Sequence, residues 1–261
     1  MKFKSIFWLF NFVVVFALLM FSAASFLLFG RDYAGMYWSN MWVILLLFLV
    51  LIAILDFYFI HHWSLFTLLE KEDWPGLLAW LETTIYAKGH LRRSYASLLI
   101  NAALTVSNLE AIRRLDAQVR EKKPSLLPSL GVALGIPALL SRDWKAVEEH
   151  FGPLAEDPKT KNRDWARWCR ALAQGTEGYE EMAQLLNGND ASVRLLAQDV
   201  LHNQSSECSQ AIQAQLTSAR TLMKAQLAGA HGDKLLAKSR ESHLLAVVLS
   251  SRVNQAREAL C

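Results

Sequence analysis

The sequence predicts an all-α protein in which an N-terminal transmembrane helical hairpin precedes a domain of repeated helix pairs and a C-terminal helical hairpin. Three observations predict this fold class. Hydrophobic residues make up 53% of the 261 positions and are concentrated before residue 62. A pattern of capping and apolar residues then recurs every 35 residues. Finally, three widely spaced cysteines argue against a disulfide framework and favour a reducing compartment.

Two apolar runs predict the membrane anchor, within a first domain of residues 1–62. Residues 7–29 contain no ionisable side chain, and Asp56 is the only acidic residue in the second run, residues 41–61. About 20 apolar residues cross a bilayer core as a helix, so each run is long enough. Residues 30–40 are the more polar turn between them. A cleaved signal peptide is the alternative for the first run, which is longer than a typical signal-peptide core.

The basic residues near the ends of these runs predict the orientation of the hairpin. Lys2 and Lys4 precede the first run, four basic residues between positions 71 and 93 follow the second, and Arg31 is the only one in the turn. Because cytoplasmic loops carry the excess of Lys and Arg, both termini are predicted to be cytoplasmic. The prediction is therefore an integral membrane protein with two spans.

Asn11 and Asp56 are the strongly polar residues within the two runs. Counted from the ends of the turn, they differ in depth by three residues, about 4.5 Å along a helix axis. We therefore predict that they approach each other across the hairpin as a polar pair. The alternatives are that Asp56 faces the headgroups or the helix of a partner. A transport role is disfavoured, because the runs contain too few polar groups for one.

Residues 63–203 contain the repeat, which begins at positions 73, 108, 143 and 178. Its first column holds residue types that cap helix N-termini: Asp73, Asn108, Asp143 and Gly178. Its second column is large and apolar: Trp74, Leu109, Trp144 and Tyr179. Its fifth column lies three positions further along the same helix face: Leu77, Ile112, Val147 and Met182.

A second helix with the same period is predicted at residues 94–105, 129–140 and 164–175. Projected back by 35 residues it falls on residues 59–70, so the array begins on the end of the second membrane helix. A single helix pair cannot bury its apolar faces, whereas stacked pairs share a continuous core. The period therefore predicts an extended stack of helix pairs.

The segment Asp143–Pro158 resembles the second helix of a tetratricopeptide repeat, with an aromatic residue, Trp144, second and Asp157-Pro158 last. The resemblance covers roughly residues 63–203 and implies a helical solenoid that binds a protein partner. Two features depart from the family pattern. The period is 35 where the family has 34, and large residues fill the fifth column where a small one is expected. Wider helix packing follows from the second, and other helical-hairpin solenoids stay open.

Beyond residue 203 the repeat fades, and residues 204–261 are predicted to form a hairpin of two longer helices. These are Ser206–Leu227 and Asp233–Leu260, on either side of a glycine-containing turn. Seven basic and three acidic residues fall within residues 208–261. A polar cap for the end of the solenoid is one interpretation. A surface for an anionic partner or membrane is the other.

Catalytic, cofactor and metal motifs are absent from the sequence, so neither an enzyme nor a bound cofactor or metal is predicted. Gly131 and Gly135 lie in a repeat helix and are interpreted as packing positions, and most tryptophans of the repeat are assigned to the core. The formal net charge is only +3 and both signs are mixed, which gives no nucleic-acid signal.

One basic cluster is predicted to bind a partner: Lys159, Lys161, Arg163, Arg167 and Arg170. The three arginines are spaced by four and three residues, so they share a face if their helix begins by Arg163. The tetratricopeptide resemblance implies that this helix lines a concave groove, where an acidic peptide would dock on the arginine forks. A solvated face balanced by Glu156 and Asp157 is the alternative.

Together these features predict a membrane-anchored protein–protein interaction adaptor. Its cytoplasmic repeat domain recruits or positions a partner at the inner face of a bacterial-type membrane. A structural subunit of a larger membrane complex, packing through the transmembrane hairpin, is the alternative. The expected partners are a protein and the lipid bilayer, and not nucleic acid.

Overall fold

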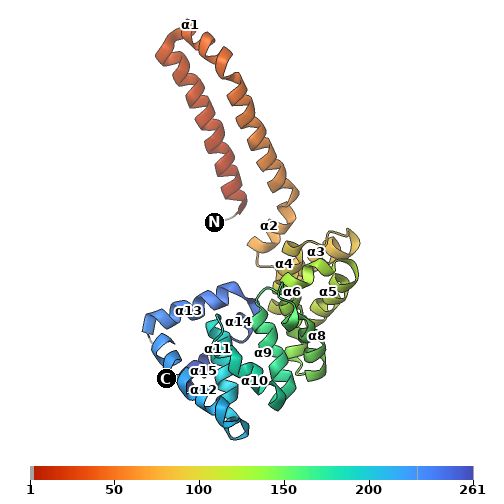
Figure 1. Ribbon diagram of the computed structural model, residues 1–261. Coiled ribbons are helices and arrows are strands. Elements are labelled where there is room, and N and C mark those ends of the chain that lie inside the picture. The colour runs from red at the N-terminus through yellow and green to blue at the C-terminus, as the bar shows by residue number, and fades with distance from the viewer. Residues whose placement is uncertain (1–2, 228, 261) are drawn as a thin grey trace. The chain divides into compact units, whose positions relative to one another are not determined.

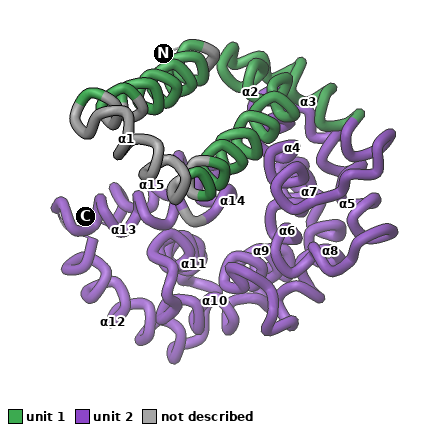
Figure 2. Tube along the Cα trace, turned by 90° about the horizontal axis from the view of Figure 1, so that it is seen from above, with its two compact units in different colours: residues 1–83 green, residues 84–261 purple. Residues whose placement is uncertain are grey.

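The computed structural model describes the backbone of residues 3–227 and 229–260. Within these ranges it contains helices and turns and no strand, which confirms the all-α class. The chain divides into two compact units, Met1–Thr83 and Thr84–Cys261 (Figure 2). The first boundary thus falls about 20 residues after the predicted end of the anchor domain, and residues 204–261 do not separate from the residues before them.

In the first unit, α1 (Phe3–His61) folds back on itself. A straight helix would place Asn11 and Asp56 about 68 Å apart, yet Asn11 Nδ2 lies 3.2 Å from Asp56 Oδ1. Figure 1 shows the two antiparallel arms, which we call the first arm (residues 5–27) and the second arm (residues 42–61). The helical pattern continues through residues 30–40, where the sequence predicted a turn.

No single helix among the described residues combines the length and the apolar composition needed to cross a membrane. Two bent pairs meet both conditions by length and composition, Leu46–His61 with Trp63–Glu70 and Leu109–Lys122 with Pro124–Leu140. The predicted orientation depends on Lys2, Lys4 and Arg31, whose side chains lie outside the part of the chain that is described.

Aromatic side chains join the open ends of the two arms. The ring of Phe7 lies 6.0 Å from that of Phe59 and 5.7 Å from that of Trp63. The chain bends by 61° after the second arm and continues as α2 (Trp63–Glu70) and α3 (Trp74–Glu82). The first repeat helix therefore follows the arm directly, as the projected period predicted, but begins at Trp63 instead of residue 59.

Within the described residues, four short helical turns connect some of the remaining helices. The π-helical turn Thr83–Ala87 leads into the second unit, where the 3-10 turns are Pro124–Leu126, Gly175–Gly178 and Ser205–Glu207. The α-helices of this unit are α4 (Arg93–Thr105), α5 (Leu109–Lys122), α6 (Leu127–Leu134), α7 (Ile136–Leu140), α8 (Trp144–Glu156), α9 (Arg163–Gln174), α10 (Tyr179–Leu185), α11 (Ala191–Asn203), α12 (Gln210–Leu227), α13 (Gly229–Ser242), α14 (Leu244–Val248) and α15 (Ser250–Leu260). Consecutive helices pack as pairs, α4 with α5, α8 with α9 and α10 with α11.

The turns that lead into α3, α5 and α8 share one geometry at 35-residue intervals. In each, the residue before the predicted cap adopts a left-handed conformation, with φ of 53°, 57° and 53° at Glu72, Ser107 and Arg142. The N–H of the next residue then bonds the carbonyl five residues back, at 3.1, 2.7 and 3.2 Å from Asp73, Asn108 and Asp143. This is a Schellman motif, which closes the preceding helix.

The same residues also cap the helices that follow. The side chains of Asp73, Asn108 and Asp143 each accept a hydrogen bond from the backbone N–H three residues on. One residue therefore ends one helix and begins the next, which explains why Asp or Asn recurs at these three positions. The fourth turn differs. Gly178 has no side chain to cap α10, and a Cβ there would collide with the carbonyl of Ala171.

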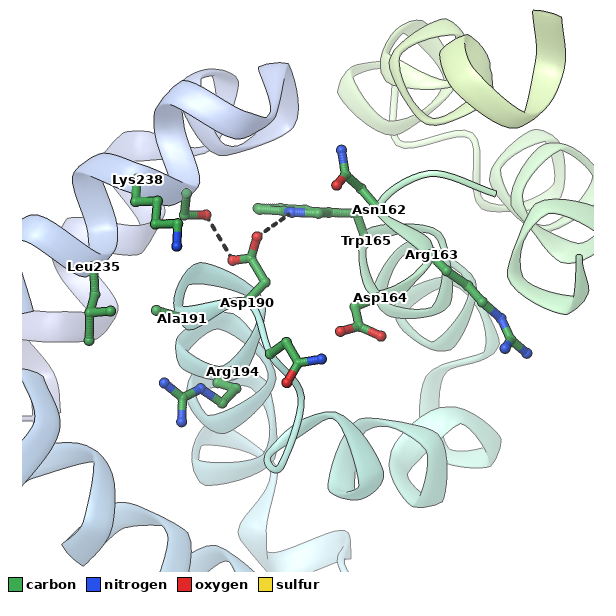
Figure 3. Close-up of a pocket in the computed structure, with 11 residues that line it drawn as sticks. Asn162, Arg163, Asp164, Trp165, Asp190, Ala191, Arg194, Leu235 and Lys238 are labelled. Atoms are coloured by element: carbon green, nitrogen blue, oxygen red, sulfur yellow. Dashed lines mark hydrogen bonds between the residues drawn. The ribbon is translucent and has the colours of Figure 1, made fainter. Parts of the chain in front are cut away.

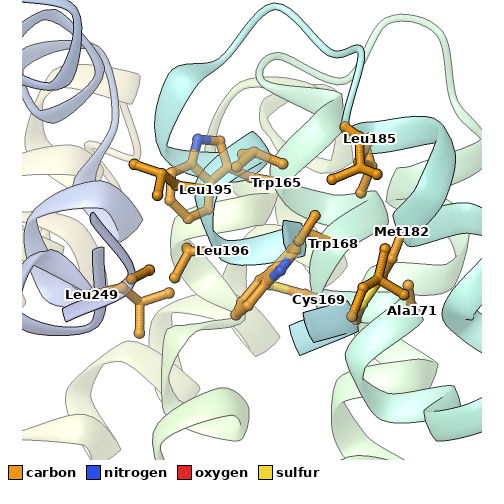
Figure 4. Close-up of a cluster of buried hydrophobic side chains, with 14 of the residues drawn as sticks. Trp165, Trp168, Cys169, Ala171, Met182, Leu185, Leu195, Leu196 and Leu249 are labelled. Carbon is orange, nitrogen blue, oxygen red and sulfur yellow. The ribbon is translucent and has the colours of Figure 1, made fainter. Parts of the chain in front are cut away.

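The fifth repeat column lies in the core, because each of its residues is at most 1% exposed: Leu77, Ile112, Val147 and Met182. Val147 and Met182 belong to one continuous cluster that runs from Val132 to Leu260 and includes Trp165 and Trp168 (Figure 4). The prediction that most tryptophans of the repeat lie in the core is wrong, because Trp74 and Trp80 are only half-buried and Trp144 is 42% exposed. Trp144 is the first residue of α8, and a helix end offers less neighbouring surface than the middle of a helix.

Gly131 and Gly135 allow α8 to pack closely on α6 and the turn after it. A Cβ at Gly131 would lie 2.7 Å from Leu154 Cδ2, and one at Gly135 would collide with the ring of Phe151. Because the Phe151 ring is fully buried, it has no room to move away. The interpretation of both glycines as packing positions is therefore confirmed.

The predicted C-terminal hairpin is wrong in its second half. The helix after α12 begins at Gly229, where φ is 63°, and is interrupted at His243 and again at Leu249. His243 is extended, and its ring stacks on Trp165 with centroids 5.5 Å apart. A contact with a residue 78 positions earlier thus breaks a helix that the local sequence favours.

Candidate functional site

The structure brings together the predicted polar pair of the hairpin. Asn11 Nδ2 donates to Asp56 Oδ1 at 3.2 Å and also to the carbonyl oxygen of Phe7 at 3.1 Å. Both side chains are half-buried. Within the described residues, Asn11 is the hydrogen-bond partner of the Asp56 carboxylate, and no cation lies within ion-pair distance of it.

Two arginines of the predicted partner-binding cluster form ion pairs with a glutamate of the same chain. Helix α9 begins at Arg163, as the shared face requires. On that face, Arg167 Nε donates to Glu181 Oε1 at 2.8 Å. Arg170 donates to both oxygens of the same carboxylate, at 2.8 and 3.0 Å. These hydrogen bonds raise the pKa of the Arg170 guanidinium above its ordinary value. Bidentate pairs of this kind hold α9 against α10.

In the rest of the cluster, Arg163 stabilises the fold and the two lysines lie at the surface. Arg163 Nε donates to the carbonyl oxygen of Ala155 at 2.6 Å, which ties the start of α9 to the end of α8. Lys159 and Lys161 are both exposed, and Lys161 also lines a cleft. The prediction that the three arginines present a free anion-binding face is therefore corrected, because their guanidinium groups already bond Glu181 and a backbone carbonyl. Lys159 and Lys161 stay candidate binding residues, and Lys161 is the one that lines a cleft.

The cleft beside Lys161 has a volume of about 260 Å³ and is lined by helices from both ends of the second unit. Helix α4 contributes a polar stripe at four-residue intervals, Arg93, Ser97 and Asn101, which therefore share one helix face. The opposite wall comes from the break between α13 and α14. The lining residues are Arg93, Ser97, Ile100, Asn101, Ser129, Leu130, Ala133, Lys161, Asn162, Glu241, His243 and Leu244.

A second cleft of about 360 Å³ shares Asn162 with the first and opens beside the starts of α9 and α11 (Figure 3). Asp190 holds its walls together. The carboxylate caps α11 through the N–H groups of Ser192 and Val193, and it accepts from Trp165 Nε1 at 3.1 Å and from the Ser239 hydroxyl at 2.8 Å. Three elements, α9, α11 and α13, thus meet at one side chain. We call the two clefts together the Lys161 groove.

His243 contributes a neutral wall to this groove. Its Nδ1 accepts from the N–H of Leu245 at 3.1 Å, which begins α14 and requires an unprotonated nitrogen. Burial lowers the pKa of His243 to about 4, a shift that Asp190 opposes and Lys161 reinforces. The imidazole therefore stays uncharged at neutral pH and serves as a helix cap that packs on Trp165.

The groove carries an excess of free positive charge. Its lining holds five cationic residues, Arg93, Lys161, Arg163, Arg194 and Lys238, and three acidic ones, Asp164, Asp190 and Glu241. Of the cations, Arg93, Lys161 and Lys238 form no ion pair with any described residue, while the Asp190 carboxylate already accepts four hydrogen bonds. Amide groups of Asn101 and Asn162 add further hydrogen-bonding capacity. Such a surface is suited to carboxylates or phosphates. Within the described residues, no cluster of three or more His, Cys, Asp or Glu side chains is placed to hold a metal ion.

A second polar cluster, Asp116, Arg120 and His150, is structural. His150 Nε2 lies 2.8 Å from the carbonyl oxygen of Gly131, and Nδ1 lies 2.8 Å from an Arg120 nitrogen. The carbonyl oxygen can only accept, so Nε2 donates to it, and Nδ1 also lies 3.5 Å from Asp116 Oδ2. The hydrogen bonds and charges of His150 and Arg120 outweigh desolvation, which is the largest single influence, and lower the pKa of Asp116.

Sequence reasoning found Lys161 but missed most of the groove. Arg93 and Lys238 are separated by 145 positions, and neither belongs to a charge run, so no local signal connected them. The spacing of Arg93, Ser97 and Asn101 on one face of α4 was a usable signal. This spacing indicated which face of α4 is polar, but it did not indicate which residues line the other side of the cleft.

Residues 111–261 match the model of a family described as "Uncharacterised Treponema protein". The chain belongs to this family. A curated relative, an uncharacterized protein of Treponema pallidum (strain Nichols), is 24% identical over 176 residues, which cover 66% of this chain and 55% of the relative. The chain thus spans about half the length of that relative. No solved structure matches the chain. The region that defines the family supplies every wall of the groove except α4.

Proposed function

We propose that this protein is a membrane-anchored adaptor. The two arms of α1 insert into a lipid bilayer, and the Lys161 groove recruits or positions a protein partner through an acidic segment. Both termini then lie in the cytoplasm of a bacterial-type cell, as the basic residues around the arms favour. The proposal includes no enzymatic step, cofactor or metal.

The observation that carries the anchor is the outward-facing apolar surface of α1. Large hydrophobic side chains are exposed along both arms, including Trp8 (70%) and Phe57 (72%). From residue 63 onward, the described chain exposes only four such side chains, Leu140, Trp144, Leu222 and Val247. An apolar surface of this extent is unfavourable in water and favourable in hydrocarbon. A helix also suits a bilayer because its backbone hydrogen bonds are satisfied internally.

The free cations of the groove support recruitment of an acidic segment. Arg93 and Lys161 project from different elements into one cleft, and Lys238 lines the adjoining one. A peptide carboxylate placed there gains charge-assisted hydrogen bonds without displacing an existing ion pair. The repeated turn at Glu72, Ser107 and Arg142 supports the further proposal that residues 63–203 form a tetratricopeptide-like solenoid, since a constant turn stacks successive helix pairs in the same way.

The anchor is tested by extraction of native membranes. We expect the full chain to stay in the membrane pellet in sodium carbonate at high pH and to dissolve only in detergent. Recovery in the carbonate supernatant contradicts the anchor, because a protein held only at the surface is released by that wash.

The groove is tested with a photo-crosslinking amino acid in the full chain in native membranes. We expect an adduct from position 97 or 101, inside the groove, and none from position 145, an exposed site on α8. Lys161→Glu should abolish the adduct, whereas Lys159→Glu, an equal change of charge two residues away, should leave it. An adduct that survives Lys161→Glu, or that forms equally from position 145, contradicts recruitment through the groove.

The second candidate function is a structural subunit of a larger membrane complex that packs through its hairpin. One observation favours it. Asp56 is the only charged residue among the described side chains of the two arms, and its carboxylate has a single hydrogen-bond partner.

A further inference from the structure

The Asn11–Asp56 pair has unused hydrogen-bonding capacity of one kind only. A carboxamide has two N–H donors, and Asn11 uses both, one on the Phe7 carbonyl and one on Asp56 Oδ1. With respect to the described residues, what remains on the pair is Asn11 Oδ1, Asp56 Oδ2 and the negative charge. The two oxygens can accept hydrogen bonds and the charge can attract a cation, but none of the three can donate a hydrogen bond.

The position of the pair on α1 makes this imbalance costly. Exposed apolar side chains continue beyond the pair toward the open ends of both arms, with Trp8 70%, Phe57 72% and Ile60 63% exposed. Asp56 therefore lies inside the apolar surface and not at its edge. An ionised carboxylate at such a depth is unfavourable unless a partner group neutralises it.

We infer that Asn11 and Asp56 form a docking site for a basic side chain carried by a transmembrane helix of a partner protein. This inference rests on the proposed bilayer location of α1. Charge complementarity selects the occupant, because the site offers one negative charge and only acceptors. Half-burial of both side chains leaves the pair reachable from outside the hairpin.

The donor count disfavours a second copy of this chain as the occupant. A second copy presents the same pair, whose donors are equally spent and whose charge has the same sign. Two such pairs would therefore repel each other across a shared interface. A partner with Lys or Arg at the matching depth satisfies Asp56 Oδ2 and the charge together.

The experiment uses full-length protein in phosphatidylcholine vesicles and a synthetic single-span helix of leucine and alanine. The peptide carries one Lys five residues from its end, because Asp56 lies five residues, about 7.5 Å, from the end of α1. Matched peptides carry Leu or Glu at that position. Energy transfer between labelled protein and labelled peptide reports association. We expect the order Lys, then Leu, then Glu, with about tenfold between Lys and Leu, which corresponds to about 1.4 kcal/mol.

Two variants connect the preference to the pair. Asp56→Asn keeps the shape and the acceptor for Asn11 but removes the charge, so the Lys and Leu peptides should bind equally. Exchange of the two residues, Asn11→Asp with Asp56→Asn, restores one carboxylate at the same level and should restore the preference. No preference in the natural chain, or one that survives Asp56→Asn, overturns the docking site.

A carbonate wash of the same vesicles separates the two proposals. Protein that resists the wash but shows no preference for the Lys peptide disproves the docking site and leaves the anchor intact. Protein that is removed by the wash disproves the anchor, and the docking site is overturned with it. Energy transfer between two labelled copies of the chain, at the level seen with the Lys peptide, indicates self-association and also overturns the assignment.

Discussion

The arms of α1 and the helices of residues 84–261 use apolar side chains in opposite ways. Along the arms, residues such as Leu47 and Phe57 are 66% and 72% exposed, whereas Ile112 and Phe151 in the second unit are completely buried. Both regions are helical, so local structure does not explain the contrast. An exposed apolar surface is unfavourable in water, so the contrast supports the proposed bilayer location of the arms.

The two regions also differ in how their half-buried carboxylates are neutralised. Glu181 is held by three hydrogen bonds from two arginines, while Asp56 receives one hydrogen bond from an amide. The second unit neutralises its half-buried charge internally. Within the described part of the hairpin no cation pairs with Asp56, which is the basis of the proposed docking site.

The largest loss of stability is expected when the Glu181 carboxylate, which pairs with two arginines of the same chain, is removed. Glu181→Ala leaves Arg167 and Arg170 partly buried without their shared partner, and should lower the free energy of unfolding by about 3 kcal/mol. Tryptophan fluorescence during urea unfolding measures it. Glu180→Ala, an exposed neighbour, should change stability by less than about 0.5 kcal/mol. Equal effects of the two changes contradict a structural role for the Glu181 pair. Combined replacement of Arg163, Arg167 and Arg170 by Glu should likewise lower the free energy of unfolding, because it removes the ion pairs between α9 and α10.

Acid should weaken the second unit through His243. Its pKa is about 4 when folded and 6.5 when unfolded, so between these values the unfolded chain binds the proton and the folded chain does not. Stability is therefore lost as the pH falls through this window, by about 2 kcal/mol from pH 7 to pH 5. His243→Asn retains a cap for α14 but does not titrate, and should remove that part of the pH dependence from urea unfolding curves. An unchanged slope in the variant shows that other groups are responsible.

Close packing in the second unit is tested by two glycines, Gly135 within the contact with Phe151 and Gly152 outside it. Gly135→Ala places a Cβ against Phe151, and overpacking of this kind costs between about 1 and 3 kcal/mol. Gly152→Ala on α8 meets nothing within 4 Å and should stabilise by up to about 1 kcal/mol, because alanine favours helix. Thermal unfolding followed by circular dichroism compares them. The packing argument fails if both variants shift the midpoint in the same direction.

The smallest effect is expected at the repeated turns. Ser107 and Arg142 adopt left-handed conformations that favour glycine, so Ser107→Gly and Arg142→Gly should each stabilise by up to about 1 kcal/mol. Gly175→Ala, at φ 62°, is the converse change and should destabilise. Calorimetric midpoints resolve shifts of this size. Destabilisation by both glycine substitutions contradicts the strain expected at these residues.

Several parts of the fold could be predicted because they depend on neighbours in the sequence. Asp73, Asn108 and Asp143 cap helices through an N–H only three residues away, and the fifth-column residues share a face by helical geometry alone. The approach of Asn11 and Asp56 also followed from counting, since two antiparallel arms from one turn leave a single depth for each residue.

Other features depended on which distant segments meet. The sequence showed that Arg163, Arg167 and Arg170 share a helix face. That Glu181 occupies this face, and that Lys161 instead faces a cleft with Arg93, depended on the packing of α10 and α4. His243 interrupts a predicted helix because stacking on Trp165 and capping Leu245 outweigh local helix propensity. Periodicity and capping act within about one helical turn, so they determined the helices and their faces. Side-chain partners 10 to 150 positions apart are chosen by the packed chain, so only the tertiary structure decided which charges were free to bind.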